Sequence, residues 1–280
     1  MMEFLSPSKY AYIPLGEWIE KYVKDWLFAQ RPVFKKISVP IENTLDAMDA
    51  LFNLVPLPLV ILFFVFAAFK TNGLKFAIFT FVSLVFIDLL NVWEETMTTM
   101  AMIVTAVLFC CVIGIPLGIL ASRNNTFEMI LRPVLDVMQT IPSFVYLIPV
   151  VMLFGVGLTP GVIAIIIFSI APVIRLTNLG LRQVGKGVID AGRALGCSKL
   201  VILYKIELPL ALKTILAGVN QTLMLSLSMA VIAALIGAGG LGLTVYVGLG
   251  RLDIGQAFVG GLGIVLIAII FDRITQKMIS

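Results

Sequence analysis

Histidine is absent from this 280-residue sequence, and charged residues make up only 13% of it. Without histidine, the chain lacks the commonest metal ligand and a frequent acid–base group of enzymes. The three cysteines, Cys110, Cys111 and Cys197, form neither a disulfide framework nor a metal-binding spacing. The net charge of +4 is not gathered into a basic stripe interleaved with aromatic residues, which weighs against nucleic acid as a partner. A soluble domain carries about twice this charged fraction.

The sequence has instead a series of long, nearly uncharged apolar runs, which are typical of transmembrane helices. Hydrophobic residues make up 60% of the chain. We therefore predict an all-α, polytopic transmembrane helical bundle. The seven expected spans are 54–69, 74–90, 97–121, 138–156, 160–178, 214–237 and 256–272. The first two are shorter than the roughly 20 residues that a bilayer requires, so we expect their edges to extend by a few residues. Asn72-Gly73 predicts a tight turn between them.

Residues 1–53 are predicted to form an amphipathic leader that does not cross the membrane. From Leu15 to Leu27 the apolar residues recur with helical spacing opposite a charged face, and Arg31-Pro32 is expected to end this helix. A second, weaker apolar stripe follows from Phe34 to Phe52. Because tryptophan and tyrosine favour the membrane interface, we interpret the leader as an interfacial segment; the alternative is a helix that packs on protein.

Lysine and arginine gather in every second loop between the expected spans. The basic segments contain Lys70 and Lys75, Arg123 and Arg132, a run from Arg182 to Lys213, and Arg273 and Lys277. The intervening loops are poor in positive charge. The positive-inside rule therefore places the basic loops and the C-terminus in the cytoplasm and the N-terminus outside.

The longest loop between spans, 179–213, carries a spaced set of residues. Asp190-Ala191-Gly192 is followed by Gly196, and the set ends at Leu208-Pro209. Gly196 predicts a left-handed end to a short helix, and Ser198 predicts the start of a second helix over 199–207, which Pro209 follows. The loop is therefore expected to form a rigid helix-turn-helix that protrudes into the cytoplasm.

This spacing resembles the EAA loop of ABC importer permeases, in which Glu-Ala-Ala, a later glycine and Ile-x-Leu-Pro recur at the same distances. Asp190 stands where the family has glutamate, and Gly192 where it has the second alanine. The resemblance implies that the loop docks on a separate cytoplasmic ATPase subunit, which carries ATP and magnesium. The glycine-rich run 237–242 lacks the Lys-Ser/Thr ending of a phosphate-binding loop, so we expect this chain to be non-catalytic and without a cofactor.

Segments between 93 and 275 are similar to the betaine and choline branch of these permeases. They are 138–149, 172–180, 220–222, 227–229, 231–242 and 272–275. The similarity implies a type I importer permease of a prokaryotic plasma membrane, with a leader (1–53), two peripheral spans (54–90) and a core (91–280). It also implies a homodimer in lipid, an extracytoplasmic binding protein, and glycine betaine or a related quaternary-ammonium osmolyte as cargo. The alternatives are choline, carnitine or another amino-acid-like solute, or, in another class, a stand-alone channel or secondary carrier.

Candidate residues for the translocation path are polar or soft side chains within the spans. No Asp, Glu or Lys lies clearly at the middle of a span, which weighs against an ion-coupled carrier. The candidates are Gln139, Thr140, Asn220, Gln221, Ser226, Ser228 and Met229. For each, the alternative is a hydrogen bond or packing contact between helices. Phe144 and Tyr146 are candidates for a cation–π contact to a trimethylammonium group, with packing as the alternative.

Glycines repeat at helical spacing in two of the expected spans. Gly114 and Gly118 form one small-xxx-small pair, and Gly260, Gly261 and Gly263 form a second small face. Small residues at this spacing let helix backbones approach each other closely. We therefore expect a close helix contact at each of these two places.

Overall fold

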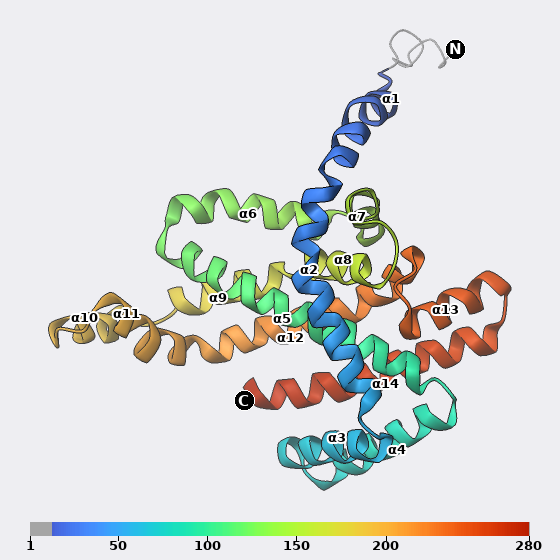
Figure 1. Ribbon diagram of the computed structural model, residues 1–280. Coiled ribbons are helices and arrows are strands. Elements are labelled where there is room, and N and C mark those ends of the chain that lie inside the picture. Colours follow the sequence, from blue (N-terminus) through green and yellow to red (C-terminus); the bar gives the residue numbers. More distant parts are fainter. Residues whose placement is uncertain (1–12, 280) are drawn as a thin grey trace, which may run out of the picture.

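The computed structural model describes residues 13–279, and every regular element in that range is helical (Figure 1). The predicted all-α class is therefore confirmed. The α-helices are α1 (Leu15–Trp18), α2 (Asp25–Leu54), α3 (Leu57–Asn72), α4 (Leu74–Leu89), α5 (Trp93–Arg123), α6 (Asn125–Thr140), α7 (Leu147–Phe154), α8 (Leu158–Ser169), α9 (Ala171–Arg182), α10 (Lys186–Ala194), α11 (Lys199–Ile202), α12 (Leu208–Ala233), α13 (Gly240–Arg251) and α14 (Ile254–Ile279).

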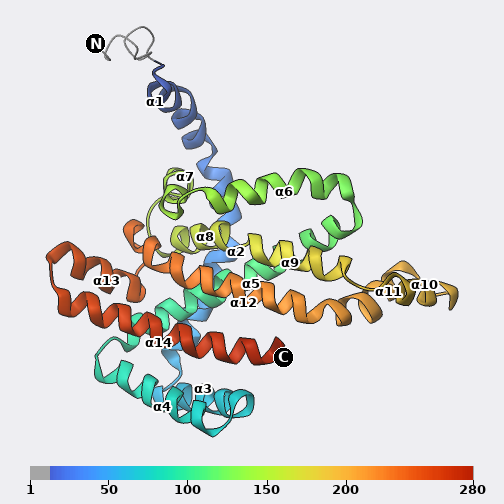
Figure 2. The same ribbon diagram turned by 180° about the vertical axis from the view of Figure 1, so that it is seen from behind.

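Four helical stretches are long and apolar enough to cross a membrane. They are Trp93–Arg123, Leu158–Arg182, Lys199–Ile236 and Ile254–Lys277. Each contains or closely overlaps one of the spans expected from the sequence. They run alongside one another in the body of the molecule, with α9 packed against both α5 and α12 (Figures 1 and 2).

The expected span 138–156 is not a straight helix, and this prediction was wrong. Helix α6 ends at Thr140, and the chain turns by 109° before continuing through 143–154. Pro142 explains the break, because a proline disfavours the helical conformation of the residue before it, here Ile141. The bent pair counts at most as one broken span.

The two peripheral helices are short. Helices α3 and α4 have 16 residues each and form a hairpin around Gly73, which has a φ of 81°. The predicted tight turn is therefore confirmed. Helix α3 also continues from α2 through a 102° bend at Val55-Pro56, so the described residues hold four long spans, or six if each bent pair is one span. Seven separate spans are not found, and a membrane crossing by α3 and α4 stays a prediction.

The leader helix does not end at Arg31-Pro32 as predicted. Helix α2 runs through both Pro32 and Pro40 to Leu54 and crosses over the bundle, packing against α5, α7 and α8 (Figure 1). Leu45 on the second apolar stripe is fully buried, and Met48 and Phe52 are partly buried against the core. The burial of the half of α2 that follows Pro40 offsets the hydrogen bond that this proline removes, whereas Pro32 lies in the exposed half.

Glycines bring the central helices into close contact, as predicted for Gly114 and Gly118. A Cβ atom on Gly118 would lie 2.8 Å from the Ile174 carbonyl oxygen of α9, and one on Gly114 would lie 2.4 Å from a Val173 methyl carbon. On the other side of α9, a Cβ on Gly218 of α12 would lie 3.1 Å from the Val173 Cα atom. Helix α9 is thus held between two backbones that only glycine lets approach so closely.

The second small face divides into two parts. Cβ atoms on Gly260 and Gly263 would crowd Val245 and Leu241 of α13, whereas one on Gly261 would meet nothing within 4 Å. Helix α13 lies between the expected spans 214–237 and 256–272, where no span was predicted. Positive φ angles at Gly237, Gly239 and Gly240 turn the chain back after α12, so that α13 packs against α14.

Candidate functional site

The loop singled out by its spacing forms a helical hairpin, residues 186–207, that protrudes from one end of the bundle (Figures 1 and 2). Its first arm is α10. Gly196 has a φ of 77°, its N–H donates to the Arg193 carbonyl at 2.9 Å, and the Cys197 N–H donates to the Gly192 carbonyl at 3.1 Å. This pair of bonds is the Schellman motif that a C-terminal glycine favours. The Ser198 hydroxyl then accepts from the Val201 N–H at 3.4 Å, which starts α11 as predicted.

Gly192 explains how closely the two arms of the hairpin pack. The residue is buried, and a Cβ atom there would lie 2.9 Å from the Ile206 Cδ1 atom of the second arm. The contact is with the far end of a flexible side chain. Glycine in place of the alanine of the family pattern therefore lets the two arms pack more closely and leaves the helical hairpin itself unchanged.

The second helix was expected to cover 199–207 and to end before Pro209, and this expectation was wrong. A π-helical turn, Leu203–Glu207, joins α11 directly to α12, so that one continuous helix runs over Lys199–Ile236. Pro209 lies inside this continuous helix, directly after the π-helical turn, and the missing N–H does not end the helix there. The hairpin is therefore a direct extension of a long span.

The outer surface of the hairpin is apolar and solvent-exposed. Leu195 is 84% exposed, and Leu200 and Tyr204 are each 67% exposed. Asp190 forms only an exposed ion pair with Arg193, at 3.1 Å, and such pairs contribute about 0–1 kcal/mol. Ala191 and Pro209 are also exposed, while Leu208 is partly buried. Exposed leucines and a tyrosine, with the exposed Lys199 and Lys205 next to them in the sequence, are suited to contact with another protein.

Sequence reasoning missed the residues that attach the hairpin to the bundle. The Glu207 side chain is 2% exposed and forms a two-bond ion pair with Arg123, the last residue of α5. Arg123 had been used only as one of the basic residues that predict membrane orientation. The two residues are separated by 84 positions, so no local sequence pattern predicts the pair.

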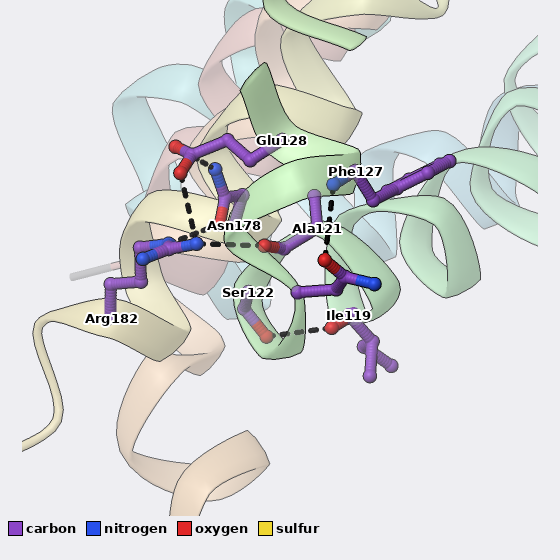
Figure 3. Close-up of polar contacts among 8 residues, drawn as sticks. Ile119, Ala121, Ser122, Phe127, Glu128, Asn178 and Arg182 are labelled. Carbon is purple, nitrogen blue, oxygen red and sulfur yellow. Dashed lines mark hydrogen bonds and ion pairs between the residues drawn. The ribbon is translucent and has the colours of Figure 1, made fainter. Parts of the chain in front are cut away.

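A second polar cluster lies beside it, where the ends of α5, α6 and α9 meet (Figure 3). Arg182 donates to the Ala121 carbonyl at 2.8 Å and forms an ion pair with Glu128 at 2.9 Å. Asn178 bonds both to Glu128, at 2.9 Å, and to Arg182, at 2.8 Å. This cluster joins the helix that leads into the hairpin to two of its neighbours.

The candidate path residues fall into two groups. Ser226 is buried and donates to the Ser169 hydroxyl at 2.9 Å, Met229 is fully buried, and Asn220 is held by Asp272 and Thr275 of α14. These three residues therefore take part in hydrogen bonds or packing between helices, which was the alternative to a role in the translocation path. The other four candidates are exposed on the single chain: Gln139 and Thr140 at the end of α6, and Gln221 and Ser228 on α12.

The two aromatic candidates also separate. Tyr146 is buried, its hydroxyl donates to the Met138 carbonyl, and its ring packs edge-on against Phe168. Phe144 is exposed. Packing therefore occupies Tyr146 in this chain, whereas the Phe144 ring remains accessible.

Comparison with known proteins places the chain in a family. Residues 114–278 match the family described as binding-protein-dependent transport system inner membrane component. The chain is 49% identical to the glycine betaine/proline betaine transport system permease protein ProW of Escherichia coli, over 98% of this chain and 77% of that protein. It is 46% identical to the glycine betaine/carnitine transport permease protein GbuB of Listeria monocytogenes, over 94% of this chain and 95% of that protein.

A solved structure shares the fold. An inward-facing conformation of the MetNI methionine ABC transporter aligns with a TM-score of 0.61 at 21% identity, over 67% of this chain and 94% of the other. At this identity the likeness speaks for the fold alone. The family match, the close relatives and the helical bundle agree, and the chain is a member of the binding-protein-dependent transport system inner membrane components, the permease subunits of ABC importers.

Proposed function

We propose that this chain is the permease subunit of an ATP-driven importer whose cargo is glycine betaine or a closely related quaternary-ammonium osmolyte. The observation that carries the proposal is the identity of 49% over nearly the whole chain to a permease named for glycine betaine and proline betaine. A relative named for glycine betaine and carnitine, at 46%, supports the same chemical class of cargo.

The 186–207 hairpin is proposed as the contact for the ATPase subunit. Its exposed leucines and tyrosine offer an apolar contact surface, and Asp190 is bound only by a weak surface ion pair. Two copies of the chain would enclose the path, each with an ATPase subunit at the hairpin and with a binding protein at the opposite face. Closure of the ATPase dimer would then bring the hairpins together and alternate the access of the path.

Contacts between distant segments support the proposed orientation. The Asn72 side chain donates to the Arg273 carbonyl at 2.8 Å, so the turn between Lys70 and Lys75 lies beside the basic C-terminal helix end. Arg123 lies against the base of the hairpin through Glu207. Because these basic segments share one end of the bundle, we assign that end to the cytoplasm of a prokaryotic cell. The N-terminus is assigned to the outer side.

The exposed candidates are proposed to face the path. Gln221 and Ser228 are seven positions apart, which puts them on one face of α12. That face is open on the single chain, as a path shared by two copies requires. Neutral polar groups suit a cargo without net charge, and the exposed Phe144 ring suits a trimethylammonium group.

Reconstitution tests this function directly. The chain would be placed in proteoliposomes with its ATPase and its binding protein, and uptake of labelled glycine betaine would be followed with and without internal ATP. We expect ATP-dependent uptake that excess unlabelled proline betaine suppresses. Stronger suppression by choline or carnitine would reassign the cargo. Uptake without the ATPase that an ionophore abolishes would show a secondary carrier and refute the proposal.

A further inference from the structure

Two contacts join the base of the protruding hairpin to the last turn of the same helix, α5. Arg182 ends α9, the helix that leads into the hairpin, and Glu207 is the last residue of the hairpin's second arm. Arg182 contacts Ala121, and Glu207 contacts Arg123, two residues apart at the end of α5. We call these two contacts the α5 ties.

The first tie is an ion pair with one buried partner. Arg123 approaches Glu207 with two guanidinium nitrogens, one at 3.1 Å from Oε1 and the other bonded to Oε2. Only 2% of the Glu207 side chain is exposed, whereas 45% of the Arg123 side chain is. A carboxylate buried to this degree requires its partner, and the planar fork of arginine fixes the mutual orientation of the two helices.

The second tie satisfies a helix end. Ala121 belongs to the last four residues of α5, whose carbonyl oxygens have no partner within the helix. Arg182 supplies a donor and a positive charge at this negative end of the helix dipole. The same guanidinium also bonds to Glu128 of α6 and to Asn178, so that three helix ends share one side chain (Figure 3).

Helix α6 combines a narrow apolar face with polar contacts to α9. Leu135 is its only buried residue, Leu131 and Met138 are partly buried against the core, and Met129 and Ile130 are 69% and 63% exposed. The contacts from its polar side to α9 are Glu128 with Arg182 and Asn178, and Asp136 with Arg175 at 2.6 Å. A displacement of α9 can therefore reach α6 through these side chains.

We propose that Arg123, Glu207 and Arg182 are positioning residues that transmit a displacement of the hairpin to α5 and, through Glu128, to α6. This inference rests on the proposed function of the chain as an ATP-driven permease. With both ties in place, the hairpin cannot move without carrying the end of α5 with it. With a tie removed, the hairpin moves while α6, which carries the exposed Gln139 and Thr140, stays behind.

The test uses the complete transporter in proteoliposomes and measures labelled-betaine uptake and ATP hydrolysis together. The variants are Glu207→Gln, Arg182→Lys, and the exchange of Arg123→Glu with Glu207→Arg. Lysine keeps the charge of Arg182 but lacks the fork that reaches several acceptors at once. Glu20→Gln is the matched control, because Glu20 pairs with Lys24 only on the surface, within one helical turn.

We expect Glu207→Gln and Arg182→Lys to keep hydrolysing ATP while uptake per ATP falls by about 2- to 30-fold, the range of measured coupling changes along such networks. The exchange variant should recover part of that ratio, and Glu20→Gln should match the wild type. A role in stability alone would lower the melting temperature and the yield of folded protein but leave uptake per ATP unchanged.

An unchanged ratio in both single variants would therefore overturn the proposal, whatever their stability. If Glu207→Gln does not fold, Arg182→Lys and the exchange variant decide by the same ratio. Failure of the wild type to import betaine would count against the proposed cargo instead. Stimulation of ATP hydrolysis by the binding protein, compared between wild type and variants, would then still decide whether the ties transmit movement.

Discussion

The close approach of α5 to α9 makes a quantitative prediction for Gly118→Ala. The added Cβ would lie 2.8 Å from the Ile174 carbonyl oxygen and 2.6 Å from the Thr177 Cβ atom. The Ile174 oxygen is backbone, so it cannot rotate away, and the helices must separate by roughly half an ångström. A gap of about that size removes a quarter or more of the dispersion energy of each contact that it opens. Overpacking of this kind costs about 1–3 kcal/mol.

Gly261→Ala in α14 is the matched control, because a Cβ there meets nothing within 4 Å. Both substitutions raise helix propensity by the same amount, about 1 kcal/mol, so that this gain cancels when the two variants are compared. The remaining difference is the overpacking cost. At about 2–4 °C per kcal/mol for a chain of this size, Gly118→Ala should melt about 2–12 °C below Gly261→Ala.

The assay is thermal unfolding of both variants in one detergent, followed by intrinsic fluorescence at a single heating rate. The common rate matters because membrane proteins often unfold irreversibly. Equal melting temperatures for the two variants would refute the reasoning, since they would show that α5 and α9 are not in contact at Gly118. A lower melting temperature for Gly261→Ala would refute it as well.

Three further predictions concern separate parts of the chain. Gly196→Pro should disrupt the hairpin, because proline cannot adopt a φ of 77° and lacks the N–H that donates to the Arg193 carbonyl. ATP hydrolysis should persist while betaine uptake is lost. Asp190→Lys should act in the same direction. Arg31→Ala should destabilise α7, because the Arg31 guanidinium donates to the Met152 carbonyl at 2.6 Å and to the Val151 carbonyl at 3.4 Å. A loss of about 1 kcal/mol predicts roughly fivefold faster amide hydrogen exchange in residues 147–154. Unchanged exchange would contradict this prediction. Ser226→Ala removes the bond to Ser169, which contributes about 0.6 kcal/mol, so the melting temperature should fall slightly. The KM for betaine should stay unchanged. A raised KM would show instead that Ser226 lines the path.

Local patterns in the sequence predicted the parts of the fold that local chemistry decides. The hairpin turn followed from Gly196 and Ser198, whose roles depend on a few neighbouring backbone groups. The four long spans followed from apolar length. The broken span at Pro142 was missed because hydropathy counts apolar residues and ignores the direction of the chain, although the proline itself was visible.

Relations between distant segments could not be read in this way. Arg123 and Glu207 meet only because α5 and α12 pack side by side, and each residue alone resembles an ordinary loop charge. Likewise, Ser226 and Ser228 have the same chemistry, yet one is buried against Ser169 and the other is exposed. In a span with apolar residues on every side, periodicity does not tell which face meets a neighbour.

The continuous helix Lys199–Ile236 has a mechanical consequence. Its 38 residues are about 57 Å long at 1.5 Å per residue, whereas the hydrocarbon core of a bilayer is about 30 Å thick. A rigid arm of about 25 Å therefore extends beyond the hydrocarbon core, and a tilt of about 10° would displace its tip by about 4 Å. The same tilt must be absorbed at the opposite end, where Gly237, Gly239 and Gly240 follow Ile236. Positive φ angles at these three glycines turn the chain sharply there, so the straight helix ends at Ile236 and does not continue into α13.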